Sequence, residues 1–109
     1  MTGQSGRKQA ARETVFRDVN EAIERGNWPG DEDKPTAYRC ECGRLECAEL
    51  IAVTPDTYER VRSNPRLFLV LPGHNSPEIE TVVERTEDYL VVEKRDDAGA
   101  IAEATDPRS

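Results

Sequence analysis

All three cysteines of this 109-residue chain fall within the stretch YRCECGRLECAEL, where they form a CxCGxxxC pattern. An odd number of thiols cannot be fully paired as disulfides within one chain, which indicates metal binding or thiol redox chemistry. The only histidine follows in the sequence LPGHN. Three thiolates and one imidazole complete the tetrahedral ligand set of a structural Zn²⁺ ion. We therefore predict one zinc ion per chain, bound by Cys40, Cys42, Cys47 and His74.

Glycines stand next to two of the four predicted ligands. Gly43 directly follows Cys42, and Gly73 directly precedes His74. A residue without a side chain accepts a positive φ angle, which the backbone needs when it turns tightly around a metal ion. Both positions are therefore expected to be turns that aim the neighbouring ligand at the metal.

Two other interpretations of the cysteines are open at this level. Cys40 and Cys42 could form a thiol switch that Cys47 resolves. Alternatively, Cys47 could be a small buried residue and His74 an ordinary turn histidine. Acidic residues beside the cysteines are expected to raise the thiol pKa values, which disfavours a reactive thiolate unless a cation is bound. Zinc would supply that cation.

A catalytic role is disfavoured by the ligand count. Four protein ligands leave no coordination position for the water molecule that a catalytic zinc ion needs. If His74 did not bind, Glu41, Glu46 and Glu49 would become general-base candidates, although acidic side chains on a hairpin more often form a solvated face. The sequence has no second histidine for a hydrolytic triad and neither a GxxxxGK[ST] nor a GxGxxG motif. The chain is not expected to be an enzyme.

Charge and hydropathy narrow the classes of partner and compartment. The formal net charge is −7, and residues 40–94 carry eleven acidic against six basic residues. Without a basic stripe, the chain is not expected to bind nucleic acid. No stretch approaches the roughly 20 apolar residues of a membrane span, and the start MTGQSGRKQAARE lacks the apolar segment of a secretion signal. We expect a cytoplasmic protein, in which clustered cysteines stay reduced.

An amphipathic helix is predicted for residues 9–26, after a flexible leader at 1–8. Five apolar residues recur there at helical spacing, and Gly26 suits the C-terminal end. The apolar face is expected either to pack on the chain's own domain or to bind a partner's groove. Loop 27–37 follows, in which Trp28 is expected to anchor on the core. The apolar residues of the helix are Val15, Phe16, Val19, Ala22 and Ile23.

Residues 38–94 are expected to form a zinc-binding α+β domain. Short strands at Tyr38–Arg39 and at ELIAVT flank the cysteines and would make a zinc-knuckle hairpin. Thr54 and Pro55 are expected to begin a short helix, since threonine is a favoured N-cap and proline suits the first helical position.

Three further strands are predicted to form a small, mainly antiparallel sheet. The apolar run at 67–71 suits a strand that is buried on both faces, and it is the best candidate for the centre of the sheet. Strands are also predicted at Ile79–Arg85 and Tyr89–Lys94, with a helix over 77–85 as the alternative. Residues 95–109 contain too few apolar side chains to pack and are expected to be a disordered tail.

The segments CECGRLEC, YERVRSNPRLFLVLPGH and VVERTEDYLVVEK resemble a group of short bacterial proteins, actinobacterial in type. These proteins share the zinc-binding pattern CxCG…C…F.V.PGH…VV…Y.VVEK, and the resemblance covers residues 38–94 without implying a particular activity. CxCG is also similar to the first half of the SEC-C zinc motif, whose closely spaced second Cys-Cys or Cys-His pair is absent here. By the shared pattern, the matching positions are Cys40, Cys42, Cys47, Gly73 and His74.

The expected function is that of a small, non-enzymatic, zinc-stabilised module for protein interaction or regulation. One candidate surface is the amphipathic helix. The other is an acidic face at Glu41, Glu46 and Glu49, which would suit a basic patch on another protein. The alternative is a thiol-based redox or zinc-responsive sensor. The sequence does not set the oligomeric state.

Overall fold

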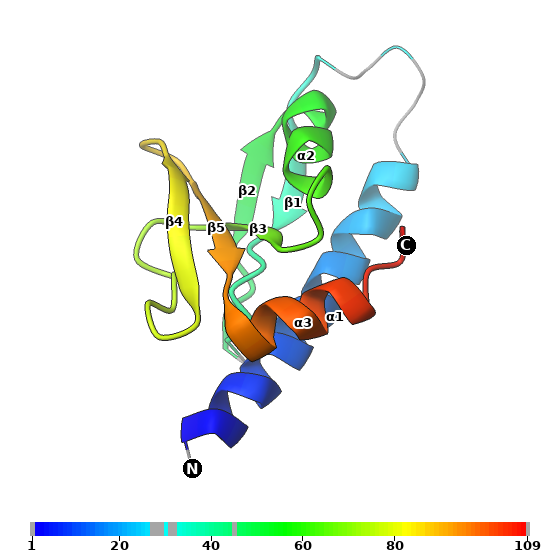
Figure 1. The fold of residues 1–109 in the computed structure, drawn as a ribbon. Coiled ribbons are helices and arrows are strands. Elements are labelled where there is room, and N and C mark those ends of the chain that lie inside the picture. Colours follow the sequence, from blue (N-terminus) through cyan, green and yellow to red (C-terminus); the bar gives the residue numbers. More distant parts are fainter. Residues whose placement is uncertain (1, 27–29, 31–32, 45, 109) are drawn as a thin grey trace.

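The described part of the chain, residues 2–26, 30, 33–44 and 46–108, forms an α+β fold of three helices and two small antiparallel sheets (Figure 1). This computed structural model confirms the predicted fold class. The predicted anchor Trp28 lies outside these residues. Among the described helices, none combines the length and the apolar composition that spanning a lipid bilayer requires. In chain order, the elements are α1 (Thr2–Arg25), β1 (Thr36–Arg39), β2 (Leu50–Val53), α2 (Pro55–Arg62), β3 (Leu67–Val70), β4 (Glu80–Arg85), β5 (Leu90–Lys94) and α3 (Asp96–Ala104).

Strands β1 and β2 form the predicted hairpin around the cysteines. Their antiparallel register pairs Tyr38 with Ile51. The backbone N–H of Cys40 donates to the carbonyl of Glu49 at 2.9 Å, which extends the ladder by one hydrogen bond. The buried ring of Tyr38 stacks on that of Tyr58 in α2, with 4.3 Å between the ring centroids. The hairpin is therefore anchored in the core by its strands as well as by its loop.

The second sheet has the strand order β3-β5-β4, with antiparallel pairs throughout. The prediction that strand 67–71 lies at the centre is wrong, because β5 takes that place. The outer edge of β3 is covered by the cysteine loop: Glu41 N donates to Leu69 O at 2.8 Å, and Leu69 N donates to Glu41 Oε1 at 2.9 Å. A covered edge explains how a nearly continuous apolar run can form an outer strand.

Local sequence signals place the remaining strands and α2 as predicted. The strands expected at Ile79–Arg85 and Tyr89–Lys94 correspond to β4 and β5, and the helical alternative for 77–85 is wrong from the start of β4 onward. Helix α2 begins at its predicted cap, where the Thr54 hydroxyl accepts from Thr57 N at 3.1 Å. Short-range chemistry was sufficient for these elements because caps and alternation act within a few residues.

Helix α1 packs on its own domain, but largely through polar side chains. It includes residues 2–8, which are helical rather than a flexible leader. Of the predicted apolar face, Phe16 is buried and Ile23 packs against the core, whereas Val15 and Val19 are 57% and 40% exposed. The inward face is therefore predicted correctly only in part. The polar side chains buried on this helix are Glu13, Thr14, Arg17, Asn20 and Glu21.

These polar groups are buried because they meet partners from distant elements. The guanidinium of Arg17 donates to the carbonyls of Pro65 and Ala102 at 2.8 and 3.1 Å. The ammonium of Lys94 forms an ion pair with Glu13. A charged group enters a protein interior only when such a partner is present. Helical periodicity alone would place these polar residues on the solvent-facing side of α1. Their partners lie far away in the sequence, so no local pattern indicates that they are buried.

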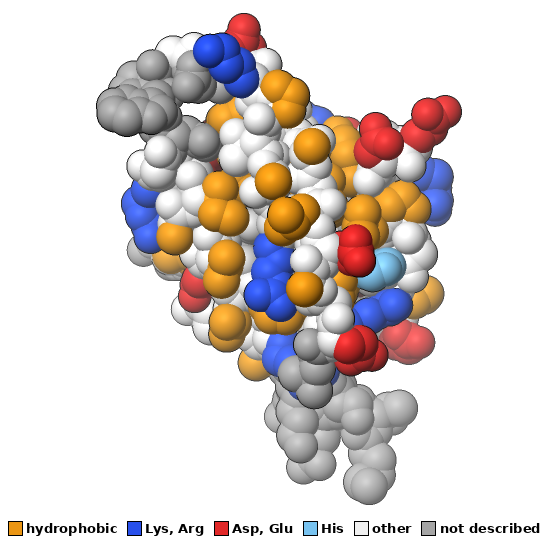
Figure 2. All heavy atoms as spheres, turned by 180° about the vertical axis from the view of Figure 1, so that it is seen from behind, with side chains coloured by type: hydrophobic (Ala, Val, Ile, Leu, Met, Phe, Trp, Pro, Cys, Tyr) orange, Lys and Arg blue, Asp and Glu red, His pale blue; other side chains and the backbone are white. Residues whose placement is uncertain are grey.

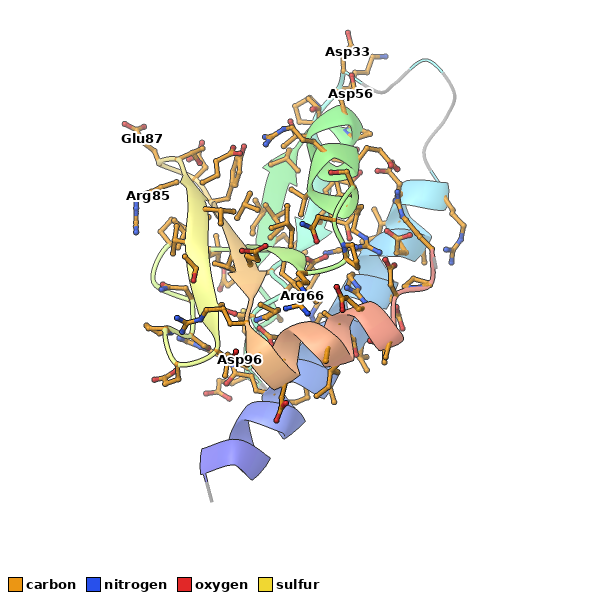
Figure 3. The ribbon with its side chains drawn as sticks, viewed as in Figure 1. Asp33, Asp56, Arg66, Arg85, Glu87 and Asp96 are labelled. Carbon is orange, nitrogen blue, oxygen red and sulfur yellow. The ribbon has the colours of Figure 1, made fainter. Side chains whose placement is uncertain are left out.

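The segment 95–109, expected to be a disordered tail, instead contains helix α3, which lies against α1 (Figure 1). The buried residues of α3 are the small Ala98, Gly99 and Ala102, and a side chain at Gly99 would collide with the guanidinium of Arg66. Arg66 also forms an ion pair with Glu103, and Figure 3 shows Arg66 beside this helix. Apolar content alone misses such a helix, because small residues and charge pairs add little hydrophobicity.

Candidate metal centre

The structure brings all four predicted ligands together. Their ligand atoms lie within 4.8 Å of one another. The Sγ atoms of Cys40 and Cys47 lie 3.7 and 3.6 Å from Nδ1 of His74. The three cysteines, including Cys42, are buried free thiols, whereas His74 is half-buried. Figure 2 shows the imidazole of this single histidine at the surface, beside acidic and basic side chains. The cluster is close enough to hold a metal ion.

The hairpin and strand β3 supply these ligands from distant parts of the chain. Cys40 directly follows β1, and Cys42 and Cys47 lie in the loop that joins β1 to β2. His74 lies in the turn after β3, which is closed by a hydrogen bond from its own backbone N–H. Because the edge of β3 pairs with this loop at Glu41, the histidine turn is held beside the cysteines.

Backbone amides surround the three sulfur atoms. Leu71 N donates to Sγ of Cys40 at 3.2 Å. The amides of Arg44 and Glu49 donate to the other two sulfurs. Amide donors stabilise the negative charge of a thiolate, which is the form in which cysteine binds a metal. The loop backbone therefore favours the metal-binding form of all three side chains.

The thiol pKa values differ from the expectation that acidic neighbours raise them all. The hydrogen bond from the Cys40 thiol lowers the pKa of Cys42 to about 4. The same bond, together with burial, raises the pKa of Cys40, and burial raises the pKa of Cys47. Hydrogen bonding within the cluster therefore lowers the pKa of one of its thiols before any cation binds.

Glu41, which was expected on an acidic surface, is instead fully buried. Its carboxylate accepts hydrogen bonds from Asn20 Nδ2 at 2.7 Å, from Tyr58 OH at 2.8 Å and from Leu69 N at 2.9 Å. Burial raises the pKa of Glu41, and the three donors oppose that shift. One carboxylate between two cysteines thus connects the cysteine loop to α1, α2 and β3.

Sequence reasoning missed Asn20 as a partner of the site. Its side-chain amide donates to Glu41 and also exchanges two hydrogen bonds with the backbone of Arg39, at 2.8 and 2.6 Å. One signal could have identified it: Asn20 stands between Phe16 and Ile23 at helical spacing, so a polar side chain occupies the inward face. No comparable signal marks Glu41, because Glu46 and Glu49 occur in the same cysteine segment and nothing local distinguishes it from them.

The two glycines beside the ligands have the positive φ angles that were predicted, 75° for Gly43 and 84° for Gly73. Their surroundings differ. A Cβ atom at Gly43 would lie 2.5 Å from Cγ of Glu13 and 2.9 Å from the carbonyl oxygen of Gln9, whereas no atom of the described residues lies within 4 Å of a Cβ at Gly73. Gly43 therefore permits both the turn and the close approach of α1.

Comparisons of the chain with family models, with curated proteins and with solved structures find no match. The resemblance to short bacterial CxCG proteins accordingly stays a prediction.

Proposed function

We propose that the cluster binds one Zn²⁺ ion. The observation that carries this proposal is the pair of Sγ–Nδ1 distances, 3.6 and 3.7 Å. A tetrahedral zinc ion with Zn–S near 2.3 Å and Zn–N near 2.0–2.1 Å separates a sulfur from a nitrogen ligand by about 3.6 Å. Thiolate and imidazole donors also suit zinc better than magnesium or calcium, which prefer oxygen.

The proposed ion has a structural role. Cys40, Cys42, Cys47 and His74 fill all four positions of a tetrahedral shell, which leaves none for substrate or water. Bound there, the ion would link the cysteine loop to the turn after β3. In a domain this small, apolar burial barely offsets chain entropy, and zinc binding can contribute on the order of 10 kcal/mol to folding.

Metal analysis of protein purified without chelator tests this assignment. We expect about one zinc ion per chain, by the ligand count, and slow reaction of the three thiols with a thiol reagent. Cys42→Ser is expected to prevent stable folding. A ratio near zero in a folded protein with three freely titrating thiols would refute the zinc proposal.

We further propose that the chain is a non-enzymatic, cytoplasmic module that acts by binding another protein. Support comes from the closed ligand shell and from the hairpin surface. Leu50 of β2 is 60% exposed, and Glu46 and Glu49 beside it in the sequence are also exposed. An apolar side chain next to carboxylates suits a partner with an apolar contact and a basic rim. The formal charge of −7 disfavours nucleic acid as the partner.

A charge-reversal experiment tests the hairpin surface. The double variant Leu50→Lys, Glu49→Lys should lose partners that wild-type protein recovers reproducibly from lysate. Glu87→Lys is the matched control, since this exposed residue lies in the turn between β4 and β5 (Figure 3). Equal recovery by the double variant, or no reproducible recovery by wild type, would count against a protein-binding role at this surface.

A thiol-based or zinc-responsive sensor is the second candidate. It is favoured by the half-buried His74, which is the one ligand partly exposed to solvent among the four, and by the lowered pKa of Cys42. Treating the zinc-loaded protein with mild oxidant, while a chromogenic chelator reports free zinc, separates the two functions. Prompt and reversible release supports the sensor, and an inert site supports the structural role.

A further inference from the structure

Two side chains of α1, those of Gln9 and Arg12, contact the loops that carry the metal ligands. The side-chain amide of Gln9 donates to the carbonyl of Cys42 at 3.3 Å and also hydrogen-bonds to the hydroxyl of Ser76, in the segment after His74. One side chain therefore contacts the cysteine loop and the histidine-bearing segment together.

A second side chain of α1 holds the next carbonyl of the cysteine loop. Arg12 Nε donates to Gly43 O at 2.7 Å. The absence of a side chain at Gly43 lets the backbone of this loop lie against Gln9 and Glu13. The two carbonyls that Gln9 and Arg12 bind thus belong to the tight turn whose shape the ligands on either side determine.

The hold on this end of α1 is polar rather than apolar. Among its described side chains, Gln9 and Arg12 reach the domain by hydrogen bonds, whereas Ala11 is exposed. From Glu13 onward, α1 is fixed by other means, beginning with the buried ion pair to Lys94. The part of α1 that is held by side-chain hydrogen bonds to the ligand loops therefore ends near residue 12.

We propose that the part of α1 that carries Gln9 and Arg12 acts as a clasp over the metal centre, so that docking of this segment and retention of the metal are coupled. The inference rests on the zinc proposal above. Gln9 and Arg12 recognise carbonyl positions that a bound metal keeps fixed, and their hydrogen bonds in turn oppose opening of the loop. Such coupling is reciprocal, because a contact that favours the metal-bound shape raises metal affinity to the same degree.

An undocked clasp would also lose its helical structure. An isolated helix shorter than about 12–15 residues is marginal in water, and this segment is shorter still. Release is therefore an order-to-disorder change in the first turns of α1, and it uncovers the cysteine loop at Cys42 and Gly43. Zinc would leave the protein faster from this open state than from the docked one.

The test compares zinc-loaded wild type with the double variant Gln9→Ala, Arg12→Ala, neither of which changes a ligand. Zinc transfer to a competing chelator should be faster in the double variant by about 5- to 30-fold, as expected for the loss of one or two hydrogen bonds. Amide hydrogen exchange of residues 6–12 should rise in the same variant, while that of α2 and β5 stays unchanged.

Val82→Ala provides a control for general destabilisation, since Val82 is partly buried against the core in β4, away from the clasp. It should lower thermal stability without faster exchange in residues 6–12. Equal zinc transfer by wild type and the double variant would overturn the clasp, as would faster exchange without faster zinc transfer. Failure of wild type to bind zinc would instead overturn the underlying metal assignment.

Discussion

At the scale of single residues, the buried carboxylate of Glu41 is as important to the cysteine loop as the ligands beside it. It accepts from three donors that belong to α1, α2 and β3. A group of this kind fixes the position of its own backbone, and in this chain that backbone carries Cys40 and Cys42. Hydrogen bonds within the protein thus hold the cysteine loop in place even without a bound metal.

Glu41→Ala should lower the free energy of unfolding by about 3 kcal/mol or more, because it leaves three buried donors without an acceptor. Tyr58→Phe removes only one of these donors and should cost about 1 kcal/mol. Urea unfolding of the zinc-loaded proteins measures both values. A cost for Glu41→Ala no larger than that for Tyr58→Phe would show that the carboxylate does not organise the loop.

The two glycines form a matched pair for testing close approach. Both have positive φ, so alanine at either position should cost about 1–2 kcal/mol in backbone strain. Only at Gly43 would the new methyl group also collide with α1. Gly43→Ala should therefore destabilise the protein clearly more than Gly73→Ala in thermal unfolding. Equal losses would mean that α1 does not approach the loop this closely.

At the scale of elements, α3 packs through small buried residues, and the residues after it are held by a cluster of charges. Arg62 pairs with Glu21 of α1 and with Asp106, at 2.8 and 2.5 Å. Arg108 pairs with Glu21 and with Glu59 of α2, at 2.9 and 2.6 Å. The C-terminal segment thus connects two helices through arginines, which makes its docking sensitive to pH.

The direction of that pH dependence follows from the carboxylates. Burial alone would raise the pKa of Glu21, but hydrogen bonds from Arg108 and Arg62 outweigh it and lower the pKa. The pKa of Asp106 is likewise lowered against the effect of burial, by the Arg108 N–H and by Arg62. A lowered pKa means that stability is fully present above the ordinary carboxylate value of about 4 and is lost as pH falls through the folded-state value.

We therefore expect α3 to loosen as the pH falls below about 4, which amide chemical shifts of residues 96–104 would report in an NMR titration. Glu21→Gln, which cannot ionise, should flatten this dependence. Glu87→Gln, in the exposed turn after β4, should leave it unchanged. An unaltered titration of α3 in Glu21→Gln would contradict the role of this ion-pair cluster.

At the scale of the whole molecule, the proposed zinc ion joins the hairpin to the three-stranded sheet. Its removal should lower the unfolding temperature sharply, because a contribution on the order of 10 kcal/mol is comparable to the total stability of a small domain. Thermal unfolding followed by circular dichroism, with and without chelator, measures this effect. Added Zn²⁺ should restore the transition, whereas Mg²⁺ should not, since it prefers oxygen ligands. Identical curves with and without chelator would contradict the structural role.

The sequence by itself determined the elements whose signals are short-ranged and the identity of the four clustered side chains. Thr54 caps α2 through its own hydroxyl, and the glycines beside Cys42 and His74 adopt the positive φ that a tight turn requires. The ligands were recognisable by residue type, because few other roles account for three clustered cysteines and a single histidine in a short chain. Caps, turns and ligand types are properties of residues within a few positions of one another.

Only the tertiary structure decided which polar groups are buried and which strand lies at the centre of the sheet. Each of these groups is buried together with a partner from a distant segment. Lys94 pairs with Glu13, Tyr58 donates to Glu41, and Arg17 donates to the carbonyl of Pro65. The central place of β5, the cover on the edge of β3 and the docking of α3 depend in the same way on contacts between distant segments. Burial of a charge is favourable only when its partner is in place, and a sequence does not show which partner the fold will bring.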